Sequence, residues 1–464
     1  MENNQSLMEK IESLSKRRGF IFQSSEIYGG FGSSYDYGPL GVELANNVKR
    51  QWWRSMVQMR QDIFGLDAAI IMHPKVWEAS GHVESFSDPL VDCKQCKRRF
   101  RADHLLEASS AKPDLDGQRE PPKNIADIVC PECGGELTEP RNFNLLMKTF
   151  VGAVEDEIST SYLRGETCQG IYVNYKNIID SSRAKIPFGI AQIGKAFRNE
   201  ITPGNFIFRT REFEQMEMQY FIHPREAEKW LKYWKEEREK WYKGLGLKDN
   251  FLRWREHGEQ ERAHYARAAW DIEFDSPFGG WKELSGVHDR GHWDLSRHEK
   301  FSGVDLKYLD PETKEKYTPQ IIETSDGVGR AMLAFLINAY EEVAARSGDD
   351  HAKHEKEVVL RLDKRLAPIK VAILPLSKKT DLEAMARDIQ KALAPDYMTQ
   401  YDATASIGKR YRRQDEIGTP YCITVDFDSL VDKQVTVRDR DTMKQNRIAI
   451  GDIKAYLAEQ YSNV

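Results

Sequence analysis

Four of the six cysteines occur as two Cys-x2-Cys pairs, Cys93 with Cys96 and Cys130 with Cys133. Each pair can form a tight turn that directs two thiolates at one point, and two such turns supply the tetrahedral sulfur cage that zinc prefers. Four thiolates would close the coordination sphere, so the sequence predicts a structural zinc site. Two unrelated pairs of reduced cysteines are the alternative, and disulfides are disfavoured in a chain expected in the cytosol.

A second group of residues suits a nucleotide. Arg198 ends one expected strand and Phe213 begins the next, so a cation that can bind phosphate lies beside a ring that can stack on a base. Downstream, Gly327-Val-Gly-Arg330 follows a strand and opens a helix, where glycines let the backbone approach a ligand and the arginine can bind a second phosphate. Each feature alone could be an ordinary surface charge or turn. Together they favour a nucleotide site.

An antiparallel sheet is expected to position these residues. Strand patterns at residues 191–198 and 207–222 flank the turn signal of residues 201–205, which predicts a hairpin. The body of the chain is therefore predicted to be α+β. Further strands are expected at 66–72, 270–274, 281–287 and 317–324, and helices at 41–60, 145–162, 225–243, 255–268 and 327–346.

A second domain is expected after the polar segment 346–357, which has no apolar periodicity. Alternating strands and helices then predict a small α/β unit with a mixed sheet. The expected domains are residues 1–350, with a cysteine-bearing insertion at about 86–142 that contains the polar segment 111–123, and residues 351–464 including the linker. The strands of the second unit are expected at 369–374, 398–402, 421–426, 434–438 and 444–448, and its helices at 381–393, 409–417 and the C-terminus.

Composition excludes several classes of protein. The 464 residues are 40% apolar and carry a net charge of −5, which is typical of a globular chain and not of disorder or of a nonspecific DNA binder. The longest mostly apolar stretch, residues 331–340, is far shorter than the roughly 20 residues of a membrane helix. No targeting signal is visible at the N-terminus, so we expect a cytoplasmic protein without a membrane partner.

Three longer motifs carry a resemblance. Tyr37-Gly-Pro-Leu-Gly-Val-Glu43, Phe197-Arg-Asn-Glu200 followed by residues 209–217, and residues 322–330 resemble the three signature motifs of class II aminoacyl-tRNA synthetases. More narrowly, they are similar to the single-polypeptide, homodimeric glycyl-tRNA synthetase family. Residues 101–107, 163–170 and 281–286 support the resemblance, which runs in order over nearly the whole chain.

The resemblance implies a function. A class II catalytic domain on an antiparallel sheet would bind ATP with Mg²⁺ and activate glycine to glycyl-adenylate, and the glycyl group would then pass to the 3′ end of tRNA(Gly). The C-terminal domain would bind the anticodon stem-loop, and the helix at 41–60 would serve a homodimer interface. A catalytically inactive, synthetase-like nucleic-acid-binding accessory protein is the alternative, as is adenylation with a non-tRNA acceptor. An inactive relative would lose Arg198, Glu283 or Arg330, and all three are present.

The resemblance also assigns residues to roles. Arg198 and Glu200 would hold the α-phosphate and the adenine amino group, while Arg330 would meet the γ-phosphate and Glu283 would hold magnesium. The remaining ATP-binding residues would be Asn199, Phe208, Arg209, Thr210, Arg211, Glu212, Phe213, Leu284, Gly327, Val328 and Gly329. Glycine would be bound by Arg101, Glu166, Phe213, Glu214, Gln215, Met216, Glu217, Glu323, Thr324, Ser325, Asp326 and Gly327.

Physical chemistry accounts for the acidic residues in that set. Glycine offers a pocket only an ammonium and a carboxylate, so Glu166, Glu217 and Glu323 can be directed at the ammonium while crowding excludes larger side chains. Outside this context, ordinary surface acidity would be the expected fate of these glutamates. The chain departs from the family pattern at Gly165 and Thr324, where the family has Pro, and at Cys168, where it has Ala.

Overall fold

The computed structural model describes residues 6–110, 124–156, 158–200, 204–258, 261–262, 266–344 and 356–462. In these residues the central feature is a seven-stranded sheet in which every neighbouring pair is antiparallel except the parallel pair at one edge. The strand order is β11 (Leu252–Glu256), β12 (Ala268–Asp275), β13 (Trp281–Gly291), β16 (Gln320–Gly327), β10 (Glu212–Ile222), β9 (Phe188–Phe197) and β3 (Ile63–Gly65). The expected antiparallel catalytic sheet is confirmed.

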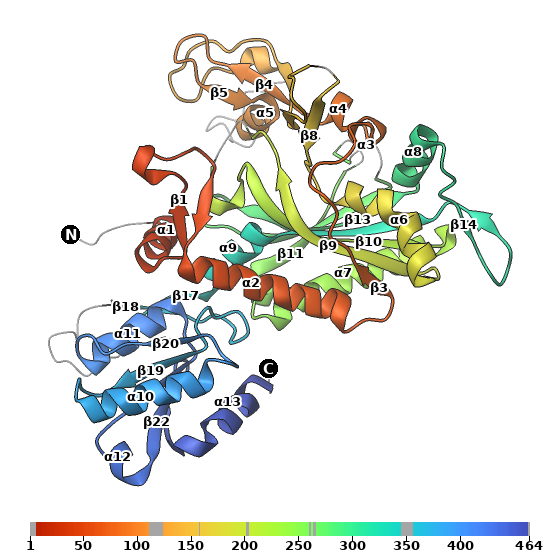
Figure 1. Cartoon of the computed structure of the whole chain (residues 1–464). Helices are drawn as coiled ribbons and strands as arrows, with labels where there is room; N and C mark the ends of the chain where they lie inside the picture. Colours follow the sequence, from red (N-terminus) through yellow and green to blue (C-terminus); the bar gives the residue numbers. More distant parts are fainter. Residues whose placement is uncertain are drawn as a thin grey trace.

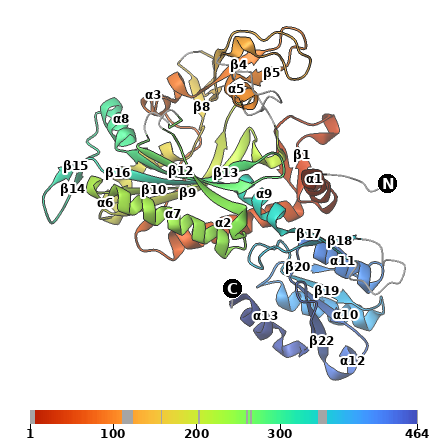
Figure 2. The same ribbon diagram turned by 180° about the vertical axis from the view of Figure 1, so that it is seen from behind.

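Helices cover the two faces of this sheet unequally (Figures 1 and 2). The even-numbered residues of β10, such as Met216 and Met218, join a large core with α2, α7 and α9. The odd-numbered Phe221 packs in a smaller core with α6 and α8 on the opposite face, which leaves part of that face open. The helices are α2 (Pro39–Trp53), α6 (Cys168–Ser182), α7 (Ala227–Gly244), α8 (Trp293–Ser302) and α9 (Val328–Ala339).

Helix α2 follows from its own sequence. Gly38 precedes it and Pro39 occupies its first turn, where the missing amide is no loss. Gly41 is required for close packing, because a Cβ at this position would lie 1.9 Å from the carbonyl oxygen of Phe20. A π-helical turn, Arg54–Gln58, extends α2, so the expected helix at residues 41–60 is confirmed. Before α2 lie α1 (Leu7–Arg18) and the paired strands β1 (Ile21–Gln23) and β2 (Tyr35–Tyr37).

A small module stands above the open face of the sheet (Figure 1). Its sheet has the order β5-β4-β6 and packs against α5 around Val91 and Ile128. A hairpin of β7 and β8 follows and leads back into α6. The elements are α3 (Lys75–Ala79), α4 (His82–Ser85), β4 (Ser87–Asp92), β5 (Arg99–Arg101), α5 (Ala102–Ser110), β6 (Arg141–Asn144), β7 (Met147–Phe150) and β8 (Thr160–Leu163). The predicted polar segment 111–123 lies outside the described residues.

The C-terminal unit has the mixed sheet that the sequence predicts. Its order in the described residues is β20-β19-β21-β22-β23, with the first three strands parallel and the last two antiparallel. It touches α2, where the Asn47 side-chain amide donates to the carbonyls of Leu366 (3.2 Å) and Ala367 (3.0 Å). The elements are β19 (Val371–Pro375), α10 (Thr380–Leu393), β20 (Thr399–Tyr401), α11 (Ile407–Ile417), β21 (Tyr421–Val425), α12 (Ser429–Asp432), β22 (Gln434–Asp439), β23 (Gln445–Ala449) and α13 (Ile453–Ser462).

Several predicted elements are wrong. Residues 145–162 form most of the β7–β8 hairpin and not a helix, because neighbouring strand residues pair across the turn. Residues 255–268 do not form a helix in their described part, since β11 runs to Glu256 to extend the sheet edge. Residues 66–72 form no continuous strand, since β3 ends at Gly65 and a single bridge joins Ile71 to Leu163.

The end of the predicted helix 327–346 and the expected linker differ as well. Helix α9 stops at Ala339, and β17 (Tyr340–Ala344) pairs with β18 (Lys356–Leu360). Most of the linker, residues 345–355, lies outside the described residues, as do residues 201–203 of the expected hairpin turn. After that turn, Phe206–Phe208 form a 3₁₀ turn before β10 begins. A small pair, β14 (Tyr308–Leu309) and β15 (Lys316–Tyr317), precedes β16. Among the described helices, none has the length and apolar character that crossing a bilayer requires.

Candidate functional site

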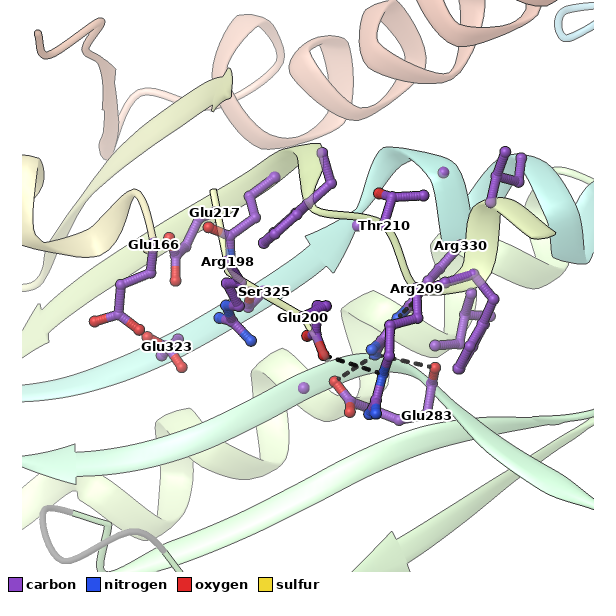
Figure 3. Close-up of a pocket in the computed structure, with 18 of the residues that line it drawn as sticks. Glu166, Arg198, Glu200, Arg209, Thr210, Glu217, Glu283, Glu323, Ser325 and Arg330 are labelled. Atoms are coloured by element: carbon purple, nitrogen blue, oxygen red, sulfur yellow. Dashed lines mark hydrogen bonds and ion pairs between the residues drawn. The ribbon is translucent and has the colours of Figure 1, made fainter. Parts of the chain in front are cut away.

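A cavity of about 210 Å³ opens on the face of the central sheet that α2, α7 and α9 do not cover. Strands β10, β13 and β16 contribute to it, together with residues just after β9, the turn before β10 and the start of α9. Figure 3 shows the labelled side chains. The lining residues are Glu166, Arg198, Glu200, Ile207, Phe208, Arg209, Thr210, Phe213, Gln215, Glu217, Glu283, Leu284, Gly286, His288, Arg290, Glu323, Ser325, Gly327, Gly329 and Arg330.

Strand alternation divides the predicted glycine-binding residues into two sets, because successive strand residues point to opposite faces. On β10, Phe213, Gln215 and Glu217 line the cavity. Glu214 instead forms an ion pair with Lys49 of α2 at 3.0 Å, and Met216 lies in the large core. The structure therefore brings the odd-numbered β10 residues of the predicted set into the cavity and leaves the even-numbered ones outside it.

The same division holds on β16. Glu323, Ser325 and Gly327 line the cavity, whereas Thr324 and Asp326 do not. Asp326 is buried on the opposite face, where it accepts hydrogen bonds from Trp52 (2.9 Å) and Tyr242 (2.8 Å) and pairs with Arg238 at 3.0 Å. This network ties β16 to α2 and α7, so Asp326 supports the strand that carries the cavity residues.

Three buried carboxylates meet at one end of the cavity. The cross-strand register places Glu217 of β10 opposite Ser325 of β16, and Figure 3 shows Glu166, Glu217 and Glu323 gathered around one space. The hydroxyl of Thr167 donates to Glu217. No cation hydrogen-bonds to Glu217 within the part of the chain that the structure describes. Such a site attracts a cationic ligand group.

The other two carboxylates have cationic or donor partners. Glu166 lies 3.2 Å from His82 Nε2 and accepts a hydrogen bond from Gln169 at 3.0 Å. Glu323 pairs with Arg290 at 2.9 Å and with His288 Nδ1 at 3.1 Å. The amide of Gln219 also donates to Glu323, at 2.8 Å.

Because their partners differ, the three acids have different pKa values. Burial and then repulsion from Glu323 and Glu166 raise the pKa of Glu217 well above its usual range. Burial also opposes ionisation of Glu166, but His82 and Arg290 outweigh it and hold its pKa well below that range. For Glu323, Arg290 and His288 overcome burial and lower the pKa to about 2. The site thus carries two ionised acids beside one whose ionisation is disfavoured until a cation arrives.

Cationic side chains line the rest of the cavity. The guanidinium of Arg198 lies between the rings of Phe86 (5.3 Å) and Phe213 (5.4 Å), and its Nε donates to the carbonyl of Gly165 at 3.0 Å. Both terminal nitrogens of Arg198 lack a hydrogen-bond partner among the described residues. Because the guanidinium is held in place by Nε while its two terminal nitrogens stay available, these two nitrogens (the guanidinium fork) can bind a phosphate in a bidentate manner.

At the far end, Arg330 pairs with Glu283 at 3.0 Å and lies over the ring of Phe208 at 4.5 Å. Arg209 Nε lies 4.0 Å from Glu200. The Oε2 atom of Glu200 is buried without a hydrogen-bond partner among the described residues. A buried acceptor of this kind needs a donor such as a nucleobase amino group.

Some predicted ATP-binding residues do not line the cavity. Glu212 forms an exposed ion pair with Lys195, and Val328 is buried at the start of α9. Arg211 donates to the carbonyls of Gly32 (2.9 Å) and Glu200 (3.2 Å), so it supports neighbouring backbone. The backbone amide of Asn199 donates to the carbonyl of Leu145 at 2.8 Å. Leu284, Thr210, Gly327 and Gly329 do line the cavity.

Arg101 also lies outside the cavity lining. It ends β5 in the module above the sheet and binds Asp88 (2.8 Å) and Asp103 (2.6 Å). Its charge acts on Glu200 and Arg209. The structure therefore places Arg101 beside the cationic half of the cavity and not at the three carboxylates.

Sequence reasoning missed several residues of the acidic half. His82 comes from α4, more than 80 positions before Glu166, and no spacing pattern links the two. Arg290, His288 and Gly286 lie on β13 directly after the predicted Glu283 and Leu284. Period-2 alternation along β13 could have found these three, because they share the face of the strand that lines the cavity.

The four cysteines of the two Cys-x2-Cys pairs come together in the module above the sheet. The sulfur atoms of Cys93 and Cys133 lie 3.5 Å apart, and those of Cys96 and Cys130 lie 3.7 Å apart. All four lie within 4.8 Å of one another. Tetrahedral zinc with bonds of about 2.3 Å would separate sulfur atoms by about 3.8 Å, so the cluster fits a zinc ion.

Comparison with known proteins places the chain in a family. Residues 153–339 match the family "tRNA synthetase class II core domain (G, H, P, S and T)", residues 370–460 match "Anticodon binding domain", and residues 88–127 match "Glycyl-tRNA synthetase insertion domain 1". A glycine–tRNA ligase of Treponema denticola is 54% identical over 466 residues, covering 100% of this chain and 99% of that protein. Glycine–tRNA ligases of Thermobifida fusca and Streptomyces coelicolor are 55% and 54% identical, each covering 98% of both chains.

Proposed function

Because the chain belongs to the glycine–tRNA ligase family of class II synthetases and has glycine–tRNA ligase activity, we propose that the cavity on the central sheet is where glycine is activated. The glycine ammonium occupies the space between Glu166, Glu217 and Glu323. Its carboxylate then points along the sheet toward Arg198. ATP lies over the cationic half, with adenine stacked on Phe213 and its amino group donating to Glu200.

The observation that carries this proposal is the polarity of one continuous cavity. Three buried acids form one end, and among them Glu217 has no cationic hydrogen-bond partner in the described residues. Arg198, Arg209 and Arg330 line the other end. An amino acid and a nucleoside triphosphate are complementary to that arrangement, because the ammonium meets the acids and the phosphates meet the arginines.

The two substrates then react by positioning and charge neutralisation. The glycine carboxylate attacks the α-phosphorus of ATP, and pyrophosphate leaves with the electron pair of the broken P–O bond. The fork of Arg198 binds the α-phosphate oxygens as their charge grows in the transition state, and Arg330 holds the γ-phosphate. The 3′-terminal ribose hydroxyl of tRNA next attacks the adenylate carbonyl and releases AMP. No protein nucleophile is required.

Magnesium fits the cationic half. Glu283 offers an exposed carboxylate at the cavity rim beside Arg330, and carboxylate oxygen is the ligand type that magnesium prefers. Glu283 would hold the ion, which when bound neutralises phosphate charge. Before ATP binds, the ion pair of Glu283 with Arg330 keeps both side chains at the rim.

The other parts of the molecule serve this reaction. Residues 351–464 bind the anticodon stem-loop of tRNA(Gly), in line with the family match over 370–460. Cys93, Cys96, Cys130 and Cys133 hold one structural zinc ion, which orders the module that carries Arg101 (about residues 86–142). The catalytic domain comprises residues 1–350, and the protein acts in the cytoplasm.

The protein also acts as a homodimer. Large apolar side chains are exposed on the catalytic unit at Ile27 (90%), Tyr28 (86%) and Ile158 (94%). Ile27 and Tyr28 are adjacent in the chain, and apolar surface of this kind can be buried against a second copy. Helix α2, the expected interface helix, belongs to the same unit.

Glycine-dependent exchange of labelled pyrophosphate into ATP tests the activation step directly. The expected result is exchange that requires glycine and whose glycine KM rises when Glu323 is changed to Gln. Glycylation of tRNA(Gly) transcripts tests the second step. Absence of both reactions in a folded preparation would favour the inactive accessory protein, and exchange without tRNA glycylation would favour a different acceptor.

A further inference from the structure

A line of four polar side chains crosses the sheet away from the acidic end of the cavity. Glu323 of β16 contacts His288 Nδ1 at 3.1 Å, and His288 Nε2 lies 3.4 Å from Asp271 of β12. Asp271 in turn contacts His257, just beyond β11, at 2.6 Å. Acid and base alternate along the line, so each histidine lies beside carboxylate and each carboxylate beside imidazole.

The sheet itself builds this line. His288 and Glu323 are cross-strand partners in the β13–β16 register, and Asp271 is the partner of Gly286 in the β12–β13 register. Gly286 leaves the room that the imidazole needs, because a Cβ at this position would lie 2.8 Å from the ring of His288. Any larger residue at 286 would displace the ring from its place between the two carboxylates.

The surroundings of His288 favour its charged form. Glu323 faces it from β16, Asp271 from β12 and His257 from beyond β11, with the two imidazole rings 6.0 Å apart. Arg290, on the same strand, shares Glu323, and Arg255 of β11 acts on His257. Burial opposes protonation of His288, but Asp271 and Glu323 outweigh it and raise its pKa to about 10.

We propose that His288, held in place by Asp271, is a positioning residue for glycine: it keeps the carboxylate of Glu323 ionised and directed at the glycine ammonium. The inference rests on the proposed binding of the ammonium by Glu323. Arg290 provides the second cationic contact of that carboxylate, so loss of His288 weakens glycine binding without abolishing it. ATP binding, at the other end of the cavity, does not depend on this line.

Kinetic constants for glycine and ATP in the pyrophosphate exchange reaction test the proposal between pH 6.5 and 8.5. His288→Gln is expected to raise the glycine KM about tenfold at every pH and to leave the ATP KM within about twofold of wild type. Asp271→Asn is expected to give a glycine KM close to wild type at pH 6.5 and a rise toward the His288→Gln value by pH 8.5. That rise follows because His288 has lost one of the two carboxylates that keep it protonated.

His223→Gln is the matched control, because His223 lies beyond the far end of β10 beside Glu315 and Tyr317. It should leave both constants unchanged. A glycine KM for Asp271→Asn that equals wild type across the pH range would overturn the proposal. Equal rises in the glycine and ATP constants at every pH would overturn it too, because a general loss of structure predicts that pattern.

Two further measurements keep the outcome decisive. If Asp271→Asn does not fold, the protonation of His288 is measured instead by NMR in wild-type enzyme that carries ¹³C-labelled histidine. The His288 ring should stay protonated at pH 8.5. Titration of this ring near the ordinary histidine pKa would overturn the inference. Glu323→Gln separates this inference from the proposed site. An unchanged glycine KM in that variant would contradict the proposed glycine site. A raised glycine KM in that variant, together with unchanged glycine KM values in the His288 and Asp271 variants, would contradict only the positioning role.

Discussion

Replacing Arg198 with alanine should remove most of the adenylation activity. The side chain is half-buried, its Nε is fixed by the carbonyl of Gly165, and its plane lies between the rings of Phe86 and Phe213. The fork is therefore oriented before ATP arrives, and little side-chain entropy is lost when it binds phosphate. Such pre-organised donors are worth roughly 3 to 5 kcal/mol in a transition state.

That free energy converts to a loss of between about 150-fold and about 5,000-fold in kcat/KM for ATP. Because Arg198 is open to solvent on one side, the lower half of the range is expected. Arg198→Lys keeps the charge but not the fork, so it should recover part of the activity. The glycine KM should change less than kcat, since Arg198 lies outside the acidic end of the cavity.

Glycine-dependent pyrophosphate exchange measures this loss, with thermal melting to show that each variant folds. Lys195→Ala is the matched control: Lys195 lies three residues earlier on β9 and forms an exposed ion pair with Glu212. It should keep exchange within about twofold of wild type, because such pairs contribute little. Exchange by Arg198→Ala within tenfold of wild type would refute the reasoning.

The remaining predictions concern metal, specificity and pH. Protein purified without chelator should contain about one zinc per chain, and Cys96→Ser should lose the metal and order of the module; a metal-free, folded and active wild-type preparation would contradict this. Alanine should not support pyrophosphate exchange, because Glu166, Glu217 and Ser325 line the acidic end of the cavity and are expected to crowd the α-carbon. Efficient alanine activation followed by tRNA-stimulated hydrolysis would instead reveal a proofreading function. Glu217→Gln should raise the melting temperature of ligand-free enzyme at pH 7.5 while raising the glycine KM. Burial and the neighbouring acids raise the pKa of Glu217, so its contribution to folding stability is present below about pH 4.3 and is lost as pH rises. The increase in melting temperature caused by Glu217→Gln should therefore shrink toward that pH. An increase that does not depend on pH would contradict the raised pKa of Glu217.

The sequence predicts the sheet well where hydrophobic period and motif agree. The residues of β10 and β16 combine buried apolar side chains on one face with cavity-lining ones on the other. Both strands overlap the predicted ranges, but β10 begins five residues later than predicted and β16 is shifted by three residues. A family motif, however, is a run of consecutive residues, whereas a strand turns only every second one toward a ligand. That is why the predicted glycine-binding set includes Glu214 and Asp326, which lie on the opposite face.

Other parts of the structure depend on partners that are distant in the sequence. Residues 147–150 form a strand because residues 160–163 pair with them, and helical periodicity gives no sign of that pairing. His82 reaches Glu166 only because α4 packs near the start of α6. Charge compensation of this kind arises from tertiary packing, so neither composition nor local spacing could predict it.

The strand order determines which strand edges remain unpaired while the chain is being synthesised. Strand β16 lies between β10 and β13, although the chain makes it after both. At ribosomal speeds, the roughly 100 residues that separate the end of β10 at Ile222 from the start of β16 at Gln320 take roughly 5 to 20 s to emerge. During that time β10 presents an unpaired edge, and β13 adds a second one after it emerges; a nascent chain with such edges is prone to aggregate or to recruit chaperones. Glu323 and Ser325 lie on β16, which pairs with both exposed edges. The acidic end of the cavity is therefore completed by the same step that removes the unpaired edges of the nascent sheet.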